Sequence, residues 1–390
     1  MIRRNMDNAT NATSTKDQTS DEQKEGLTSW LVLNRIKGFG PKTINGLLEK
    51  FESPQHIFDS SVAELKHTGL SSSAIEKIKG AVPEVDEDLA WLEAHPRHHI
   101  ITMQDPRYPS LLKEITDPPV LLYVNGDPYL LSMPQLAMVG SRSATAGGLE
   151  IAREFSRILV DMGLVVTSGL ALGVDAAAHE GALASTGRTV AVLGTGPDRI
   201  YPASHLKLAG QIVETGAIVT EFIPGAAPRK DHFPRRNRVI SGLALGTLVV
   251  EAAKQSGSLI TARFAMEQGK EVFAVPGSIR NPQAKGCHAL IREGAKLVES
   301  VEDIIEELGP VFATLYPEKD RNSAEGEMDT HSFCNEQKLI MDSLGFDPVS
   351  VNEIVERSGL TASDVSSILL ALELEGHVCS QVGGMYLRKK

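Results

Sequence analysis

The sequence has little cysteine and no long apolar run. Its three cysteines, Cys287, Cys334 and Cys379, lie far apart and form neither a Cys-x-x-Cys pair nor a His/Cys cluster with zinc spacing. We therefore expect reduced thiols and no metal site or cofactor. No apolar run approaches the roughly 20 residues that span a bilayer, and polar residues, not an apolar signal-peptide core, follow Met1-Ile2-Arg3-Arg4. These absences predict a cytosolic protein without a membrane segment.

Positive charge is also scarce. The 390 residues include 39 Lys and Arg against 50 Asp and Glu, which gives a net charge of −11. A nucleic-acid-binding protein usually has a basic domain, so this balance argues against a generic nucleic-acid binder. Any site for an anion must therefore be a local concentration of positive charge.

The length allows two to three domains with at least one sizeable core. The composition changes along the chain predict five segments. These are a polar, disordered tail over 1–26, a helical domain over 27–94, an α/β domain over 95–308 that begins with a Pro-rich connecting stretch, a polar linker over 309–335, and a winged helix over 336–390.

Short apolar strands alternate with helical segments from Gln135 onward. Continuous apolar strands joined by helices are typical of a parallel sheet that is covered on both faces. The fold class is therefore α/β, with a Rossmann-like parallel sheet and right-handed crossovers. The predicted strands are Leu136–Gly140, Leu164–Ser168, Thr189–Gly194, Ala217–Thr220, Gly246–Glu251, Glu271–Pro276 and Lys296–Val298.

Four of these strands lead into loops that contain glycine. In open parallel sheets, ligands bind at the carboxyl ends of the strands, and the amides at the following helix N-termini attract anions. A single loop of this kind is equally consistent with a tight turn that binds no ligand. Four such loops on one rim of the sheet favour a phosphate ligand. The loops begin at Gly140-Ser141-Arg142, at Gly169 to Gly173, at Gly194-Thr195-Gly196 and at Ser256-Gly257-Ser258.

The familiar nucleotide and catalytic motifs are missing. The first loop is not Gly-x-Gly-x-x-Gly, and no P-loop, Gly-x-Ser-x-Gly elbow, HExxH or zinc deaminase pattern occurs. Asp175 and His179 share a helical face, and we expect them to brace the Gly169–Asp175 loop. Glu251 could orient either a ribose or a basic residue. The sequence thus predicts a binding protein, not an enzyme.

The segment Arg229–Arg238 is the sharpest local signal. Five of its ten residues are Lys or Arg, in an otherwise acidic chain. Phe233 lies among them and offers a stacking face for any base, while Lys and Arg neutralise phosphates. Pro234 can occupy the first turn of a helix that runs to about Leu243. The pattern favours binding of single-stranded nucleic acid.

Two alternatives stay open for this segment. It could be a solvated basic loop. Within it, Arg238 and one of Arg235 and Arg236 could be structural and pair with buried acids such as Glu221 or Glu251.

The flanking domains carry weaker signals. Residues 36–43 fit the hairpin of a helix-hairpin-helix unit, whose glycine amides contact a DNA phosphate, and 69–71 resemble a second copy; a plain helical hairpin fits equally. The winged helix is acidic, with eight acidic and two basic residues between 336 and 387. Its presumed recognition helix, Thr361–Glu375, has no Lys or Arg, so we expect a protein-interaction module. A transcription regulator that reads duplex DNA is the less favoured alternative.

Several long motifs, in order, resemble the DprA/Smf family of bacterial DNA-processing proteins. The match is dense over 95–308, and the flanking domains fit the family. The motifs are Gly140-Ser141-Arg142, Ser168 to His179, Gly194-Thr195-Gly196, His232-Phe233-Pro234-Arg235-Arg236-Asn237-Arg238, Ser256 to Ala262, and Val275-Pro276-Gly277.

This resemblance implies a protein that binds single-stranded DNA in a positive pocket, forms a homodimer and loads RecA recombinase during natural transformation. Arg142, Lys230 and Phe233 match the pocket residues of the family. The residues that the resemblance places at or near the DNA are Gly140, Ser141, Arg142, Gly169, Gly173, Lys230, Phe233, Arg235 and Arg238.

One enzymatic alternative stays open. LOG-like nucleotide phosphoribohydrolases share the Rossmann-like architecture, and Ser241–Glu251 faintly resembles their Pro-Gly-Gly-x-Gly-Thr-x-x-Glu motif. The tandem glycines are missing here, so the phosphate loop would not form in the same way.

Overall fold

A nine-stranded sheet organises the larger part of this computed structural model. The structure describes residues 26–315, 335–344, 349–374, 378–381 and 385–388. They belong to two units, Met1–Leu315 and Tyr316–Lys390, each of which is described by itself. The predicted tail and most of the predicted linker lie outside the described residues.

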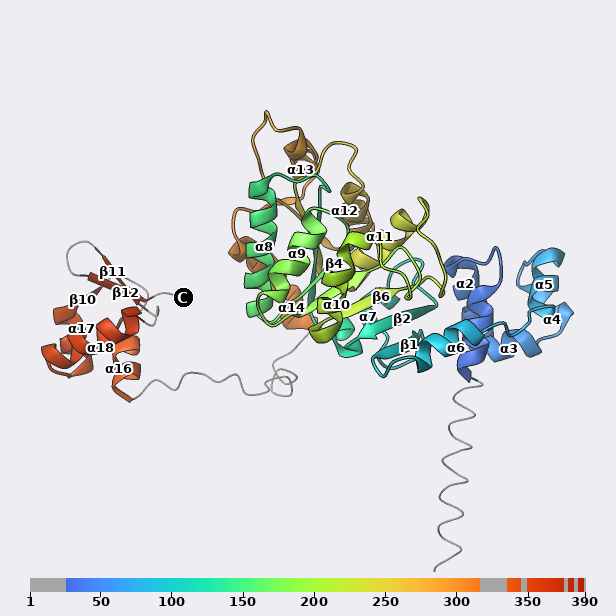
Figure 1. The fold of residues 1–390 in the computed structure, drawn as a ribbon, viewed down its shortest axis with the longest axis horizontal. Coiled ribbons are helices and arrows are strands. Elements are labelled where there is room, and N and C mark those ends of the chain that lie inside the picture. The colour runs from blue at the N-terminus through green and yellow to red at the C-terminus, as the bar shows by residue number, and fades with distance from the viewer. Residues whose placement is uncertain (1–25, 316–334, 345–348, 375–377, 382–384, 389–390) are drawn as a thin grey trace, which may run out of the picture. The chain divides into compact units, whose positions relative to one another are not determined.

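The strands occur in the order β1-β2-β6-β5-β4-β3-β7-β8-β9. The first three of these, β1, β2 and β6, lie side by side in Figure 1. Along the sheet from β6 to β9 all neighbouring strands are parallel, as the sequence predicts. Strands β4 to β7 are buried at every position, which is typical of a parallel sheet covered on both faces. The strands are β1 His98–Thr102, β2 Leu121–Gly126, β3 Gln135–Gly140, β4 Val165–Ser168, β5 Thr189–Val192, β6 Ala217–Thr220, β7 Gly246–Val250, β8 Glu271–Ala274 and β9 Lys296–Leu297.

The connecting stretch before Gln135 adds two strands to the sheet. It contains β1 and β2, which pair with each other in antiparallel fashion, and β2 pairs antiparallel with β6. A short helix, α7 (Ser110–Lys113), connects β1 to β2, and a 3-10 turn at Pro128–Ser132 connects β2 to β3.

Helices cover both faces of the sheet. On one face, α11 (His232–Leu243), α12 (Ser258–Glu267) and α13 (Lys285–Arg292) pack with Val190 and Val192 in one core. On the other, α8 (Ala146–Asp161), α9 (Val174–Leu183), α10 (Leu206–Thr215) and α14 (Val301–Leu315) pack against the alternate strand positions, such as Ala191. The last of these helices runs past the predicted start of the linker at 309, and the polar run of the sequence begins only at Tyr316.

The N-terminal helices pack on the outer strands of the sheet. Their core includes Ile100 of β1 and Tyr123 of β2. The Tyr123 hydroxyl donates to the fully buried Asp88, which also accepts a 2.6 Å hydrogen bond from Arg35 Nε. Burial raises the pKa of Tyr123 well above its usual value, so the hydroxyl remains a donor. The helices are residues 26–35, α2 Pro41–Phe51, α3 Pro54–Asp59, α4 Val62–His67, α5 Ser72–Lys79 and α6 Asp86–Glu93.

The second unit has the predicted winged-helix order. Three helices precede the antiparallel pair β11 and β12, and the short strand β10, between the first two helices, completes a three-stranded sheet in the order β10-β12-β11. Ile340, Ile354 and Leu369 lie in its own core. The predicted Gly383-Gly384 turn lies outside the described residues. The elements are α16 Asn335–Leu344, β10 Val349–Ser350, α17 Val351–Ser358, α18 Ala362–Leu374, β11 Val378–Gln381 and β12 Met385–Arg388.

Candidate nucleic-acid interface

A cavity of about 470 Å³ opens at the carboxyl ends of β3 and β7. The loop after β3, the first two turns of α11 and the loop before α12 form its walls. The side chains and backbone that line it include Gly140, Ser141, Arg142, Asp175, Phe233, Arg236, Asn237, Gln255, Ser256, Ser258, Thr261 and Gln283. Hydroxyls, amides and two arginines suit a ligand with phosphate groups.

The exposed Arg142 and the half-buried Phe233 form a platform at this cavity. The Arg142 guanidinium carbon lies 5.9 Å from the centroid of the Phe233 ring, and Tyr201 packs against the same ring at 5.6 Å. A Cβ at Gly194 would lie 2.9 Å from Phe233 Cδ1, so glycine there leaves room for the ring. The platform offers a cation for a phosphate beside an aromatic face for a base.

Arg236 supplies a second, buried positive charge. Its Nη1 donates to the carbonyls of Gly169 and Val192, both at 2.6 Å. Burial lowers the pKa of Arg236 to about 10, so it stays protonated at neutral pH. This residue is not among the site residues predicted from the sequence, although its spacing from Phe233 and Asn237 places the three on one face of α11.

The glycines of the rim make room for protein atoms. A Cβ at Gly140 would lie 2.0 Å from the Val250 carbonyl oxygen, and one at Gly169 would lie 2.1 Å from Arg236 Nη1. Gly173 has a φ of +78°, and its Cβ would lie 2.2 Å from the Ser141 carbonyl oxygen. These residues therefore let the loops pack closely on one another.

Asp175 braces its loop, as the sequence predicts. Its Oδ2 accepts from the amides of Gly169 at 3.1 Å and Ala171 at 3.3 Å. Burial raises the pKa of Asp175. His179 contacts Thr189 Oγ1 at 2.7 Å instead of the loop, and burial lowers its pKa to about 3. Both side chains thus have structural contacts.

Glu251 caps the start of α8. Its carboxylate accepts from the amide of Thr145 at 2.8 Å and from the Thr145 hydroxyl at 2.6 Å. Its carbonyl oxygen accepts from the Ser141 amide at 2.7 Å. The sequence left two roles open for Glu251, to orient a ribose or to orient a basic residue. These contacts match neither role.

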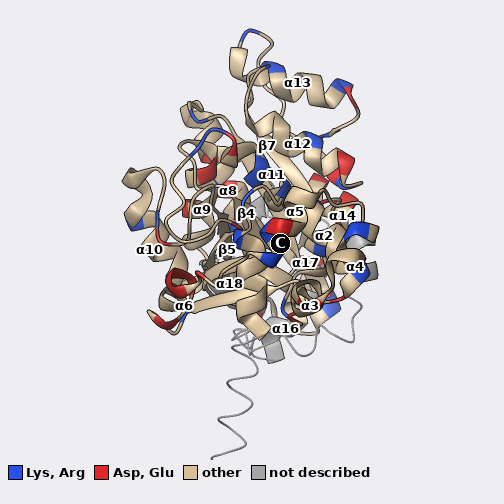
Figure 2. Ribbon diagram, turned by 90° about the vertical axis from the view of Figure 1, so that its right-hand side faces the viewer, with Lys and Arg blue, Asp and Glu red and all other residues tan. Residues whose placement is uncertain are grey.

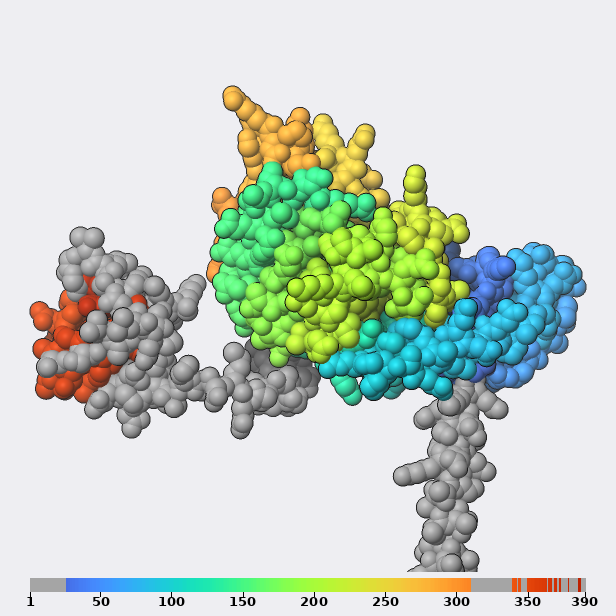
Figure 3. Space-filling view, viewed as in Figure 1, coloured from blue at the N-terminus to red at the C-terminus, as the bar shows by residue number. Residues whose placement is uncertain are grey.

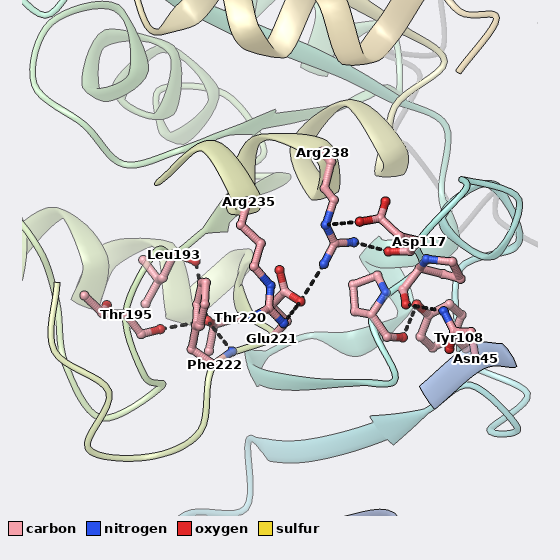
Figure 4. A network of polar contacts seen from close by, with 12 residues as sticks. Asn45, Tyr108, Asp117, Leu193, Thr195, Thr220, Glu221, Phe222, Arg235 and Arg238 are labelled. Atoms are coloured by element: carbon pink, nitrogen blue, oxygen red, sulfur yellow. Dashed lines mark hydrogen bonds and ion pairs between the residues drawn. The ribbon is translucent and has the colours of Figure 1, made fainter. Parts of the chain in front are cut away.

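Arg238 belongs to a network of polar contacts (Figure 4) and does not line the cavity. It is 2% exposed, and its Nη2 lies 2.5 Å from Glu221 Oε2, while its Nε lies 3.3 Å from Asp117. Arg235 Nη2 contacts the same Glu221 oxygen at 2.7 Å. The prediction that Arg238 contacts DNA does not fit this burial. The alternative role, a structural ion pair, holds instead, with Glu221 as the partner.

Lys230 lies outside the cavity wall. It is exposed, on the segment before α11, and has no hydrogen-bond or ion-pair partner among the described residues. Lys and Arg of this part of the chain are blue in Figure 2. The structure therefore brings together Gly140, Ser141, Arg142 and Phe233, and it leaves Gly169, Gly173, Lys230, Arg235 and Arg238 out of this cavity wall.

In the described part of the chain, no group of three or more His, Cys, Asp or Glu side chains could hold a metal ion. No helix among the described residues is both long and apolar enough to span a membrane.

Comparisons with known proteins agree with this architecture. Residues 99–309 match the family model of DNA recombination-mediator protein A, and residues 335–384 match the DprA winged helix domain. Protein Smf of Escherichia coli (strain K12) is 41% identical over 326 residues, which cover 83% of this chain and 86% of that protein. The DNA processing protein DprA of Streptococcus pneumoniae is 47% identical over 205 residues, 52% of this chain and 72% of that protein.

Two solved structures are similar to this one. The X-ray structure of DNA processing protein A from Streptococcus pneumoniae has a TM-score of 0.63 and 38% identity, and covers 72% of this chain and 97% of its own. A structure of DNA processing protein A from Helicobacter pylori, which describes its unique single-stranded DNA binding mode, has a TM-score of 0.50 and 30% identity, and covers 55% of this chain and 97% of its own.

Proposed function

This chain belongs to the family of DNA recombination-mediator protein A, also called DprA or Smf, and from that membership we propose that it binds single-stranded DNA in the cavity at the ends of β3 and β7. Phosphates contact Arg142, Lys230 and the polar groups of the wall, and a base stacks on Phe233. The similar protein from Helicobacter pylori, which binds single-stranded DNA, supports the choice of ligand.

The pairing of Arg142 with Phe233 carries this proposal. An exposed guanidinium 5.9 Å from an aromatic ring serves a phosphate and the adjoining base at once. The buried charge of Arg236 adds a fixed positive potential at the wall of the cavity. Since stacking on Phe233 requires an unpaired base, we expect a single strand to bind more tightly than a duplex.

Fluorescence anisotropy tests the proposal directly. Labelled oligo-dT and a duplex of equal length are titrated with the full chain across a range of salt. We expect tighter binding of the single strand, with affinity that falls as salt rises. The variant Arg142→Ala/Lys230→Ala should bind several-fold to 100-fold more weakly, about 1–3 kcal/mol, whereas Arg292→Ala, an exposed change outside the cavity, should bind normally.

Equal affinity for the single strand and the duplex would overturn the proposal, as would unchanged binding by the double variant. A second pair of variants isolates stacking. Phe233→Ala should lose about 1–3 kcal/mol of binding free energy, and Phe233→Tyr, which keeps an aromatic face, should retain most of it.

We further propose that the protein acts as a homodimer that protects incoming DNA and loads RecA recombinase in natural transformation. The description of the family as recombination mediators supports this role. Strand exchange by RecA on DNA coated with single-strand-binding protein, measured with and without this chain, tests it. A failure to increase RecA assembly would refute the loading role while leaving DNA binding intact.

We also propose that the protein is not an enzyme. Asp175 and His179 have structural contacts, and the Glu251 carboxylate caps α8, which leaves these acid–base candidates occupied. Incubation with nucleoside monophosphates provides the test. Release of free base would refute the proposal and revive the phosphoribohydrolase alternative.

A further inference from the structure

The first turns of α11 separate two cavities. Phe233 and Arg236 line the cavity described above, while His232 and Arg235 line a second one of about 700 Å³. The opposite wall of this second cavity is formed by the hairpin of the N-terminal helical domain, at residues 36–41. We call it the hairpin cleft. In Figure 3 the segment that leads into α11 lies beside the N-terminal helices.

The hairpin cleft is rich in positive charge. Arg35, Lys37, Arg229 and Arg235 line it, against Glu87 and Glu221. Arg35 pairs with Glu87 and Asp88, and Arg235 pairs with Glu221, so these five charges largely serve the fold. The charges available to a ligand are those of Lys37 and Arg229.

The side chains of Lys37 and Arg229 are available to bind an anion, because they pair little with carboxylates of the protein. The ammonium group of Lys37 is exposed and has no ion-pair partner among the described residues. Among the residues that the structure places, Arg229 pairs with Asp231 alone, at 3.1 Å, and both side chains are 67% exposed. Exposed pairs of this kind contribute about 0–1 kcal/mol, so a phosphate can replace the carboxylate at little cost.

Aromatic side chains line the hairpin cleft beside these charges: Phe222 is buried at 5% exposure, and His232 and Phe39 are half-buried. Phe222 stacks on His232 with ring centroids 4.1 Å apart, and the Arg235 guanidinium lies 5.2 Å from the Phe222 ring. Phe39 of the hairpin lines the opposite wall. A basic groove interleaved with aromatic side chains is the usual construction of a path for single-stranded nucleic acid.

We propose that the hairpin cleft is a second subsite for the same DNA strand, an inference that rests on the proposed function. A strand that leaves the Phe233 platform passes the N-terminal end of α11, where Lys230 is exposed, and enters the cleft. Its phosphates there contact Lys37 and Arg229. The position of the two cavities on either side of the first turns of α11 favours this occupant over an acidic segment of a partner protein.

The test compares two lengths of oligo-dT with the full chain. One, of about six nucleotides, fits a single subsite, and the other, of about 20 nucleotides, can occupy both. We compare Lys37→Ala/Arg229→Ala with a control, Lys66→Ala/Arg292→Ala, which removes the same charge from exposed positions that line neither cavity. Both variants should unfold in urea as the wild type does.

For the long oligonucleotide, we expect the cleft variant to bind about 5- to 20-fold more weakly in low salt. The slope of log K against log salt should fall by about 1.4, which is about 0.7 for each lost phosphate contact. The short oligonucleotide should bind the cleft variant within about two-fold of wild type, because it needs only the first cavity.

The outcomes separate the two proposals. If the wild type binds the short oligonucleotide and the cleft variant binds the long one as tightly as the control does, the second subsite is refuted. An equal loss for both lengths also refutes it, since the effect would then be general electrostatics. If the wild type binds neither oligonucleotide, the proposed function itself fails.

Discussion

Arg238 and Arg142 allow a test that separates support of the fold from contact with DNA. Arg238 is 2% exposed and shares the buried Glu221 with Arg235 and approaches Asp117 (Figure 4). Breaking a buried ion pair by removing one partner costs about 3–5 kcal/mol. Since Arg235 remains beside Glu221, we expect Arg238→Met to lower the free energy of unfolding by about 3 kcal/mol, the lower end of that range.

Arg142 should behave in the opposite way. It is exposed, and the contact that it makes is with the Phe233 ring, so Arg142→Ala should change the free energy of unfolding by less than about 1 kcal/mol. Its affinity for oligo-dT should fall by about 1–3 kcal/mol. The folded Arg238→Met protein should bind oligo-dT within about two-fold of wild type, since Arg238 does not line the cavity.

Urea unfolding and anisotropy measure the two quantities. Trp30 and Trp91 are the tryptophans of the chain, so their fluorescence follows unfolding of the first unit alone. The reasoning is refuted if Arg238→Met costs less than about 1 kcal/mol of stability. It is also refuted if this variant reduces the salt dependence of DNA binding as much as Arg142→Ala does.

Three further predictions follow from buried positions. Burial holds the pKa of His179 at about 3, below its ordinary 6.5, so the unfolded chain takes up the proton first. Stability should therefore fall as pH drops below about 6.5, by about 2 kcal/mol at pH 5, and urea unfolding of His179→Gln should not show this component. Gly169→Ala places a Cβ 2.1 Å from Arg236 Nη1 and should cost about 1–3 kcal/mol, whereas Gly210→Ala, with open space around it, should be neutral or stabilising in the same urea experiment. Burial raises the pKa of Cys287 to about 11, so in a chain with Cys334→Ser and Cys379→Ser a thiol reagent should react only after urea unfolds the protein; rapid reaction in the native state would contradict this burial.

The parallel sheet was predictable because its signal is local. A strand buried on both faces is mostly apolar, and Ala217–Thr220 is apolar up to its last residue. The helix from the basic segment to Leu243 was predictable for the same reason, since Pro234 suits a first turn. The antiparallel strands β1 and β2 were not predicted in the sheet, because their neighbour β6 follows β2 by roughly 90 residues and no local pattern encodes that pairing.

In the candidate site, too, some features have a local signal in the sequence and others depend on contacts between distant residues. The sequence by itself determined that a basic, aromatic segment follows a strand end near the loop of Gly140, Ser141 and Arg142, since composition and order are local properties. Only the tertiary structure decided which arginine supports the fold and which is free to contact a phosphate. Arg236 faces Gly169 and Arg238 faces Glu221, because the phase of α11 turns each toward a different neighbour. Those neighbours come from loops far apart in the chain, and burial beside them, not residue type, separates a structural arginine from one that can meet a phosphate.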